Sequence, residues 1–306
     1  MADGMARQAA GRKAGRAALL LDGSDLPRLE ALSEPDAGVF VRALLVHLGL
    51  WVAGCAAVTL SQGLPLLQLA VGMVMGSQLH ALTVLQHDCG HQSAFRRRAV
   101  NRWVGCALAA FIVLPFTSFT ELHRMHHSHL GEPDRDPDAW FDAAGPRWLH
   151  WRECLFVPRF IALSLYRPMP KSVRLRVAGE LALNLVLHAL IAISLWRVGR
   201  LDVLLFAFAL PMAALACLFN PLARGAEHAP MAHLPLGDPR RFDLRFNTVT
   251  IAHRGWGLAW ANITYHVGHH LYPRVPFHRL PQLHVMLAAR PVLQTRSLWR
   301  FVRPPN

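Results

Sequence analysis

The sequence predicts an all-α integral membrane protein with four transmembrane helices in two hairpins, a short half-membrane or interfacial element and a cytoplasmic helical cap. Two observations lead to this fold class. The 306 residues are 53% hydrophobic and only 17% charged, which is more apolar than an ordinary soluble domain. Four apolar segments also approach the roughly 20 residues that a helix needs to cross a bilayer.

The four apolar segments form two pairs along the chain. They cover residues 39–60, 64–86, 180–198 and 202–221. The link within each pair is very short, Ser61–Gly63 in the first and Gly199–Leu201 in the second. Each pair is therefore expected to be a helical hairpin, and both turns are expected on the same side of the membrane.

A fifth apolar segment, residues 104–119, is short for a span and contains Pro115. Irregular backbone at membrane depth survives only where protein buries it, so we expect a half-membrane or interfacial element here. Residues 1–38 are expected to be a partly disordered N-terminal arm. Residues 39–306 are expected to form one membrane-embedded domain, in which residues 222–306 make the cap.

The net charge of +13 suggests a membrane surface as the partner. The basic residues do not form a helix stripe with interleaved aromatics, and no nucleic-acid module is readable, so we expect no nucleic-acid partner. The arm, the centre of the chain and the cap hold nearly all Lys and Arg. The positive-inside rule then predicts an inner-membrane protein with both termini and the cap in the cytoplasm.

Histidines cluster at three predicted membrane boundaries: HDCGH at 87–91, HRMHH at 123–127 and HVGHH at 266–270. Rings at i, i+3 and i+4 are expected on one helical face, and all three clusters are expected on one side, so we expect them to meet. Eight imidazoles near a low-dielectric boundary are costly unless they bind metal.

The ligand type narrows the choice of metal. Imidazole suits Zn, Fe, Cu and Ni, but eight rings exceed what one zinc needs, and the HExxH protease signature is absent. Two iron ions with open positions for dioxygen fit the count. The five cysteines are scattered without a CxxC and suggest neither disulfides nor a thiolate site. A membrane metal transporter is the competing class, but it predicts ionisable residues throughout the spans.

The flanks of the three clusters read QHDCGHQSAF, HRMHHSHLGEPDRDPD and NITYHVGHHLYPRVPFHRLPQLH. With them the chain, over residues of about 80–285, resembles bacterial acyl desaturase-like members of the membrane fatty acid desaturase and hydroxylase superfamily, whose hallmark is the boxes HxxxH, HxxHH and HxxHH. The resemblance implies a four-helix scaffold, a cytoplasmic di-iron centre and dioxygen-dependent attack on unactivated C–H bonds. It implies no catalytic side chain beyond the metal ligands.

Site residues follow from the same resemblance. The implied metal ligands are His87, His91, His123, His126, His127, His228, His266, His269 and His270. Asp136, Asp138 and Glu227 are candidates to orient ligand rings through the other ring N–H, although each is as well explained as a turn or cap residue. Asn262, one turn before the third box, is a candidate for a water-mediated contact.

The three histidine boxes do not specify the substrate. A fatty acyl desaturase is the first expectation, while a hydroxylase, a carotenoid ketolase or a desaturase of a small amino-acid-derived substrate share the same boxes. The sequence has no haem, iron–sulfur or dinucleotide motif, so no bound haem, flavin or nicotinamide is expected. A separate electron donor, a ferredoxin or a small cytochrome with its reductase, is implied.

Overall fold

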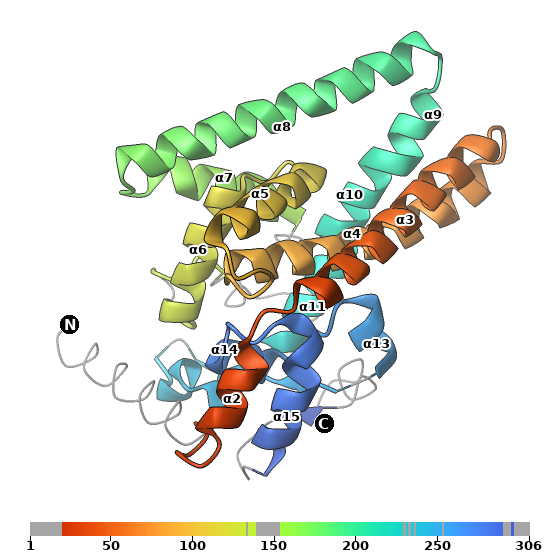
Figure 1. The fold of residues 1–306 in the computed structure, drawn as a ribbon. Helices are drawn as coiled ribbons and strands as arrows, with labels where there is room; N and C mark the ends of the chain where they lie inside the picture. Colours follow the sequence, from red (N-terminus) through yellow and green to blue (C-terminus); the bar gives the residue numbers. More distant parts are fainter. Residues whose placement is uncertain are drawn as a thin grey trace. The chain divides into compact units, whose positions relative to one another are not determined.

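The chain divides into two compact helical units (Figure 1). The computed structural model describes residues 20–132, 134–138, 154–228, 231, 234, 235, 237–252, 254–289, 295 and 296. The spanning unit comprises Asp36–Leu122 and Trp151–Asn220, and the polar unit comprises Met1–Pro35, His123–His150 and Pro221–Asn306. Residues 1–19 of the expected arm and 297–306 of the expected cap lie outside the described residues.

Four helical runs of the spanning unit are long and apolar enough to cross a membrane, which confirms the four predicted spans. They are α3 (Ala37–Leu60), α4 (Pro65–Gly90), α8 (Lys171–Arg197) and a run over Leu201–Ala223. That last run contains α9 (Leu201–Val203), η4 (Leu204–Ala209), α10 (Leu210–Ala214), η5 (Leu215–Phe219) and the start of α11 (Asn220–Glu227). The protein is thus an all-α, multi-pass membrane protein.

Local sequence explains where the first hairpin begins and turns. The Asp36 carboxylate accepts a hydrogen bond from the Val39 N–H at 3.0 Å and caps α3. Gly63 lies in the turn with φ of +83°, a backbone conformation that glycine adopts without strain. Pro65 then opens α4 at its first residue, where its missing N–H costs nothing.

The two hairpin turns lie at the same end of the spanning unit, as the short links predicted. The Arg200 guanidinium, in the second turn, donates to the Thr59 carbonyl at 3.0 Å. The Gln68 side chain of α4 donates to the Asp202 carboxylate of α9 at 2.9 Å. These polar contacts tie the first hairpin to the second.

Helix α4 approaches the fourth run closely through a Gly-x-x-x-Gly pair. A Cβ added to Gly72 would lie 2.5 Å from the Phe206 carbonyl oxygen, and one added to Gly76 would lie 2.7 Å from the Ala214 Cβ. Small residues at this spacing let membrane helices approach backbone to backbone. The partner run has widened π turns, η4 and η5, on either side of Pro211, which lacks the N–H of a regular helix.

The fifth apolar segment is part of a sharply bent helix pair. Helix α5 (Arg98–Ala109) continues through η1 (Ala110–Ile112), and α6 (Phe116–His129) follows at an angle of 98°. The chain breaks at Val113, which has φ of +56°, and at Pro115. The Glu180 carboxylate of α8 accepts hydrogen bonds from the Thr117 N–H at 2.8 Å and its hydroxyl at 2.6 Å. A neighbouring span thus satisfies donors at the start of α6.

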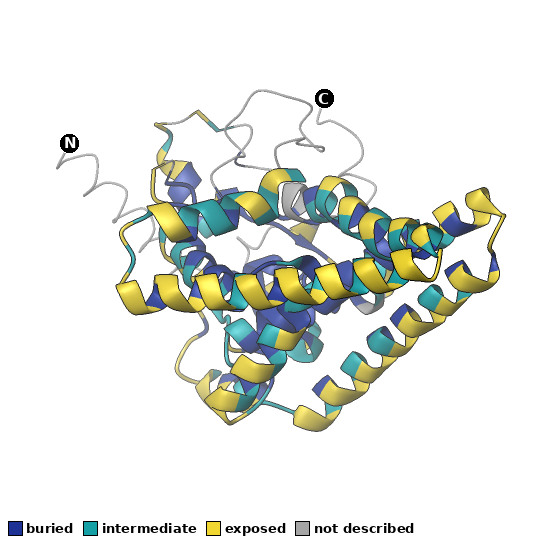
Figure 2. Ribbon diagram, turned by 90° about the horizontal axis from the view of Figure 1, so that it is seen from above, coloured by how far each residue is buried: buried dark blue, intermediate teal, exposed yellow. Residues whose placement is uncertain are grey.

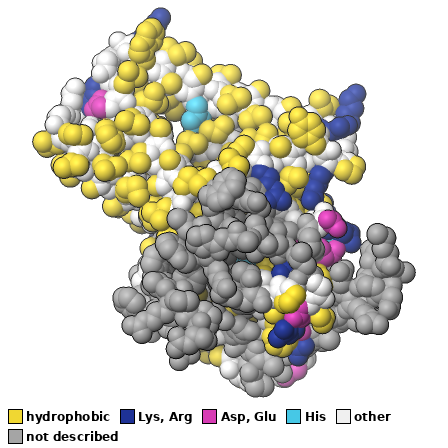
Figure 3. Space-filling view, turned by 180° about the vertical axis from the view of Figure 1, so that it is seen from behind, with side chains coloured by type: hydrophobic (Ala, Val, Ile, Leu, Met, Phe, Trp, Pro, Cys, Tyr) yellow, Lys and Arg dark blue, Asp and Glu magenta, His cyan; other side chains and the backbone are white. Residues whose placement is uncertain are grey.

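The outer surface of the spanning unit is apolar. Figure 2 shows exposed residues along most of α8, among them Leu183, Val186 and Leu190. Figure 3 shows a mostly hydrophobic face whose charged side chains lie at its margins. Such a surface suits acyl chains rather than water. A shorter apolar helix, α7 (Phe156–Tyr166), precedes α8.

The polar unit is built from short elements. They are α2 (Leu26–Ser33), η7 (Pro239–Phe242), α12 (Leu244–Asn247), β1 (Thr250–Ile251), α13 (Arg254–Ala259), α14 (His266–Leu271), η8 (Phe277–Arg279), α15 (Leu280–Ala288) and β2 (Thr295–Arg296), the two strands pairing in parallel. Leu29 and Leu32 of α2 share one core with Leu271 of α14 and Leu283 of α15. This core fixes α14, the helix of the third histidine box.

Candidate metal centre

The histidines of the second and third boxes come from two short helical segments of the polar unit. His123, His126 and His127 lie in the last two turns of α6, and His266, His269 and His270 lie in α14. His228 directly follows α11. Apart from His127, which is half-buried, these rings are buried. The structure thus brings together seven of the nine predicted ligands within one unit.

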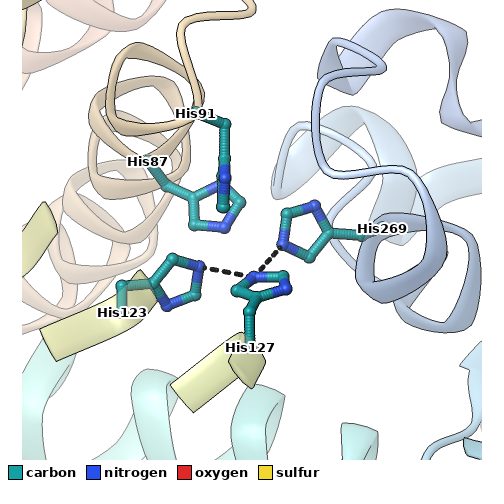
Figure 4. Close-up of side chains that lie close together, drawn as sticks. All are labelled: His87, His91, His123, His127 and His269. Carbon is teal, nitrogen blue, oxygen red and sulfur yellow. Dashed lines mark hydrogen bonds between the residues drawn. The ribbon is translucent and has the colours of Figure 1, made fainter. Parts of the chain in front are cut away.

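The first set comprises His123, His127 and His269 (Figure 4). The Nε2 atom of His127 lies 3.0 Å from the Nε2 atom of His123 and 3.0 Å from that of His269. The three rings therefore point their Nε2 atoms at a common centre.

The second set comprises His126, His228, His266 and His270. The Nε2 atom of His266 lies 3.0 Å from the Nε2 atoms of both His228 and His270. Donor atoms of His126, His228 and His270 lie within 4.8 Å of one another. This set is fully buried and forms a second centre.

Each HxxHH box contributes histidines to both sets. The second box gives two rings to the first set and one to the second, whereas the third box gives one ring to the first set and two to the second. In the second box, His123 and His127 belong to the first set and His126 to the second. In the third box, His269 belongs to the first set, while His266 and His270 belong to the second. The i, i+4 pair shares a centre because one helical turn separates the rings, whereas the i+3 ring points about 60° away.

The first box lies in the spanning unit. His87 is in the last turn of α4 and His91 directly follows that helix, with ring centroids 4.6 Å apart; Figure 4 draws this pair as well. The i, i+4 spacing thus holds the two rings together, as predicted. The buried Asp88 carboxylate lies 3.7 Å from Nδ1 of His87.

Asp136 contacts the back of a ligand ring. Its Oδ1 atom accepts from His126 Nδ1 at 2.9 Å and from the Asp138 N–H at 2.9 Å, and its Oδ2 atom accepts from the Gly131 N–H at 3.1 Å. A proton on Nδ1 leaves the Nε2 lone pair of His126 for a metal. The Asp138 carboxylate lies 3.5 Å from the same Nδ1.

His228 is oriented by a segment that the sequence did not single out. Its Nδ1 lies 3.3 Å from the Asn247 carbonyl oxygen and 3.3 Å from the Thr248 hydroxyl. Both residues are buried. No motif or periodicity in residues 238–252 marks them, because a backbone carbonyl can come from any residue type. Nδ1 protonation again leaves Nε2 of His228 for a metal.

A buried arginine interacts electrostatically with Asp136. Arg241 is 3% exposed and donates to the carbonyls of Met231 and Leu234 at 2.9 and 2.7 Å. Burial lowers the pKa of Arg241, and the nearby Asp136 carboxylate raises it. Arg241 and Asp136 thus attract each other electrostatically. Sequence reasoning missed Arg241, because an arginine in a loop carries no signal of burial.

Glu227 and Asn262 do not take the positions that the sequence predicted for them. The Glu227 carboxylate Oε2 lies 3.4 Å from Nε2 of His266, rather than from an Nδ1 atom. Asn262 lies in a turn outside α14, with φ of +57°, and its side-chain oxygen lies against Gly257. It is therefore not one helical turn below His266 on a common helix.

Burial keeps two of the predicted ligand rings, His91 and His270, in the neutral form that can bind metal. It lowers the pKa of the His270 ring well below its ordinary value, and the neighbouring imidazoles lower it further. It also lowers the pKa of His91 to about 3. Both rings are consequently neutral at pH 7, with a lone pair available for coordination.

The nitrogen spacing fits metal ions better than hydrogen bonds. An Nε2 atom offers either one proton or one lone pair, so His127 and His266 can each hydrogen-bond to only one of their two Nε2 neighbours. Two nitrogens that bind one ion at about 2.1 Å and at a right angle lie about 3.0 Å apart, the distance found in both sets. The residues present therefore fit one metal ion per set.

Comparisons with known proteins identify the family of this chain. The family model described as "Fatty acid desaturase" matches residues 59–301. The chain is 28% identical over 218 residues to a putative sphingolipid delta(4)-desaturase/C4-monooxygenase of Caenorhabditis elegans, covering 68% of this chain and 55% of that protein. It is 28% identical over 262 residues to the probable fatty acid desaturase DES1 of Sorghum bicolor, covering 76% and 64%.

A third relative is the sn-1 acyl-lipid omega-3 desaturase (ferredoxin) of Synechocystis sp., 30% identical over 98 residues, which cover 31% of this chain and 27% of that protein. The chain spans 55% and 64% of the lengths of the first two relatives. The family match covers most of the chain and includes all three histidine boxes. The chain belongs to the fatty acid desaturase family.

Proposed function

We propose that this protein is a membrane-embedded di-iron oxidoreductase that uses dioxygen to introduce a double bond into a fatty acyl chain. The observation that carries the proposal is the presence of two histidine sets, each spaced for one metal ion, in a member of the fatty acid desaturase family. Imidazole donors suit iron, and the ligand count exceeds the need of one four-coordinate zinc.

The proposal assigns nine histidines to the two irons. His123, His127 and His269 hold one iron, and His126, His228, His266 and His270 hold the other. His87 and His91 of the first box belong to the same centre, as the family resemblance implies. When bound, iron supplies the reaction with dioxygen that removes hydrogen from an unactivated methylene group.

The protein side chains prepare this centre rather than react themselves. Asp136 and the Asn247 carbonyl hold protons on Nδ1 of His126 and His228, so that Nε2 of each ring faces the iron. The burial of the second set excludes bulk water from the iron. No nucleophile or acid–base pair is needed for this chemistry.

A lipid substrate is supported by the apolar surface and by the relatives. The spans expose leucine and valine side chains, a surface that suits contact with lipid acyl chains. The relative from Caenorhabditis elegans is named as a putative sphingolipid desaturase, and the relative from Sorghum bicolor as a probable fatty acid desaturase. Oxygen insertion is the second candidate, because the name of the Caenorhabditis elegans relative includes a C4-monooxygenase.

The electron donor is proposed to be a separate acidic protein, a ferredoxin or a small cytochrome with its reductase. One relative is named as a ferredoxin-dependent desaturase. Exposed basic residues lie near the starts of α3, α5 and α8: Arg42, Arg96, Arg97, Arg98, Arg102, Lys171, Arg174 and Arg176. Basic residues attract an acidic partner. By the positive-inside rule we expect these residues on the cytoplasmic side of the inner membrane.

The test compares lipids and small metabolites by mass spectrometry in cells with and without this gene, supplied with a matched ferredoxin and reductase. Products that lack two hydrogens are expected, and their mass identifies the substrate. Products that gain oxygen would instead favour the second candidate.

Two variants link the product to the iron. His269→Ala removes a donor of the first set and is expected to lose iron and product together. His188→Ala is the matched control, because His188 hydrogen-bonds to the Asn184 carbonyl of its own helix at 2.9 Å, outside both sets. Full activity of His269→Ala, or a purified wild-type protein without iron, would refute the proposed function.

A further inference from the structure

Glu227 lies next to the second histidine set, on a side that the sequence did not predict. It is the last residue of α11, directly before His228, and is 4% exposed. Its backbone carbonyl accepts from the Val249 N–H at 2.9 Å. The carboxylate is thus anchored at the edge of the second histidine set, next to a predicted ligand.

The atom that Glu227 approaches is the decisive detail. Its Oε2 atom lies 3.4 Å from Nε2 of His266, and this Nε2 is the atom that faces His228 and His270 at 3.0 Å each. The carboxylate is therefore on the metal side of the ring. Asp136, in contrast, reaches His126 at Nδ1, on the side away from the metal.

The distance also fits shared coordination. Two donors that bind one ion at about 2.1 Å lie about 3.0 Å apart at a right angle and about 3.4 Å apart at a tetrahedral angle. The Glu227 contact therefore corresponds to a wider angle at the ion than the two imidazole contacts do. A hydrogen bond from His266 Nε2 would compete with the two imidazole contacts of the same atom. A common metal ion accounts for all three contacts together.

We propose that the Glu227 carboxylate is a ligand of the metal held by His126, His228, His266 and His270. The inference rests on the proposed function, because it requires a metal at that set. The second metal then has a mixed nitrogen and oxygen environment, whereas its partner in the first set is bound by imidazoles. The two irons are consequently unequal in charge and in spectroscopic signature.

The test uses the full-length protein purified in detergent and loaded with ⁵⁷Fe. Glu227→Gln keeps the shape but replaces the carboxylate by a neutral amide, and Glu227→Asp keeps the charge but withdraws it by one methylene. Glu132→Gln is the matched control, because Glu132 is also buried and its carboxylate contacts His129 and Arg135. The readouts are iron per chain, the rate of iron release to a chelator, and the Mössbauer spectrum.

The wild-type protein is expected to give two Mössbauer doublets of equal area. Both Glu227 variants are expected to change one doublet only and to release that half of the iron at least 10-fold faster, while Glu132→Gln matches the wild type. Two unchanged doublets in Glu227→Gln, or a wild-type spectrum for Glu227→Asp, would overturn the assignment. If Glu227→Gln is not recovered folded, the Asp variant decides alone, and a wild-type protein without iron refutes the proposed function as well.

Discussion

Replacement of Asp136 by Asn tests whether the carboxylate behind His126 tunes the second metal position. Asp136 is fully buried and accepts three hydrogen bonds, two on Oδ1 and one on Oδ2. An amide has only one acceptor oxygen, so the variant keeps at best the bonds from His126 and Asp138 and sets an NH₂ group against the Gly131 N–H. It also loses the negative charge that favours a proton on His126 Nδ1.

The magnitude follows from these contacts. Loss of a carboxylate that orients a ligand ring lowers metal affinity about 10–100-fold, or about 1.4–2.7 kcal/mol. The unpaired donor at Gly131 costs a further 1–3 kcal/mol of stability, roughly. We expect Asp136→Asn to release about half of its iron 10–100-fold faster to a chelator, followed by absorbance of the chelate.

Asp134→Asn is the control for that measurement, because Asp134 is exposed and lies two residues away in the same loop. Its iron release is expected to match that of the wild type. Wild-type iron content and release in Asp136→Asn would show that the hydrogen bond to His126 has no influence on the metal.

Two further predictions concern stability. Glu180→Gln removes a carboxylate that accepts two hydrogen bonds from Thr117. The variant should lose about 2 kcal/mol of unfolding free energy, measured as a lower unfolding temperature in detergent. Glu34→Gln, at an exposed position, is the control, and equal unfolding temperatures for the two variants would contradict the role of Glu180. Burial lowers the pKa of His284, whose ring lies 5.3 Å from that of Tyr265. Because the unfolded chain takes up a proton below about pH 6.5 and the folded ring resists it, stability is lost as the pH falls from there, by at most about 1.4 kcal/mol per pH unit. His284→Gln should flatten the loss of unfolding temperature between pH 7 and pH 5, and an unchanged pH profile would refute this.

Hydrophobicity alone located the four spans, because a helix that crosses a bilayer must be apolar over its whole length. The start of α8 was less visible, because Lys171 and Arg174 dilute the apolar pattern before Glu180. Helix α2 was not expected inside the arm at 1–38, since only Leu29 and Leu32 are buried and their partners lie more than 200 residues away in the chain.

The histidine boxes were found from their spacing, but their division between two centres was not. A helical repeat turns the i+3 ring of each box away from the i, i+4 pair, but only the packing of α6 against α14 decides which rings of the two boxes share a set. The support of His228 by the Asn247 carbonyl was equally invisible, because every residue carries the same backbone acceptor. Local patterns name ligands, whereas the tertiary structure decides which ligands share an ion.

The exchange of ligands between the second and third boxes has a consequence for biosynthesis. Within the polar unit, each set takes histidines from both α6 and α14, and His127 and His269 are separated by 142 residues of chain. During synthesis the second box leaves the ribosome long before the third, and neither box by itself can assemble either complete set. Under the proposed function, iron is therefore captured late in synthesis, which spares the cell a half-built protein that holds reactive iron.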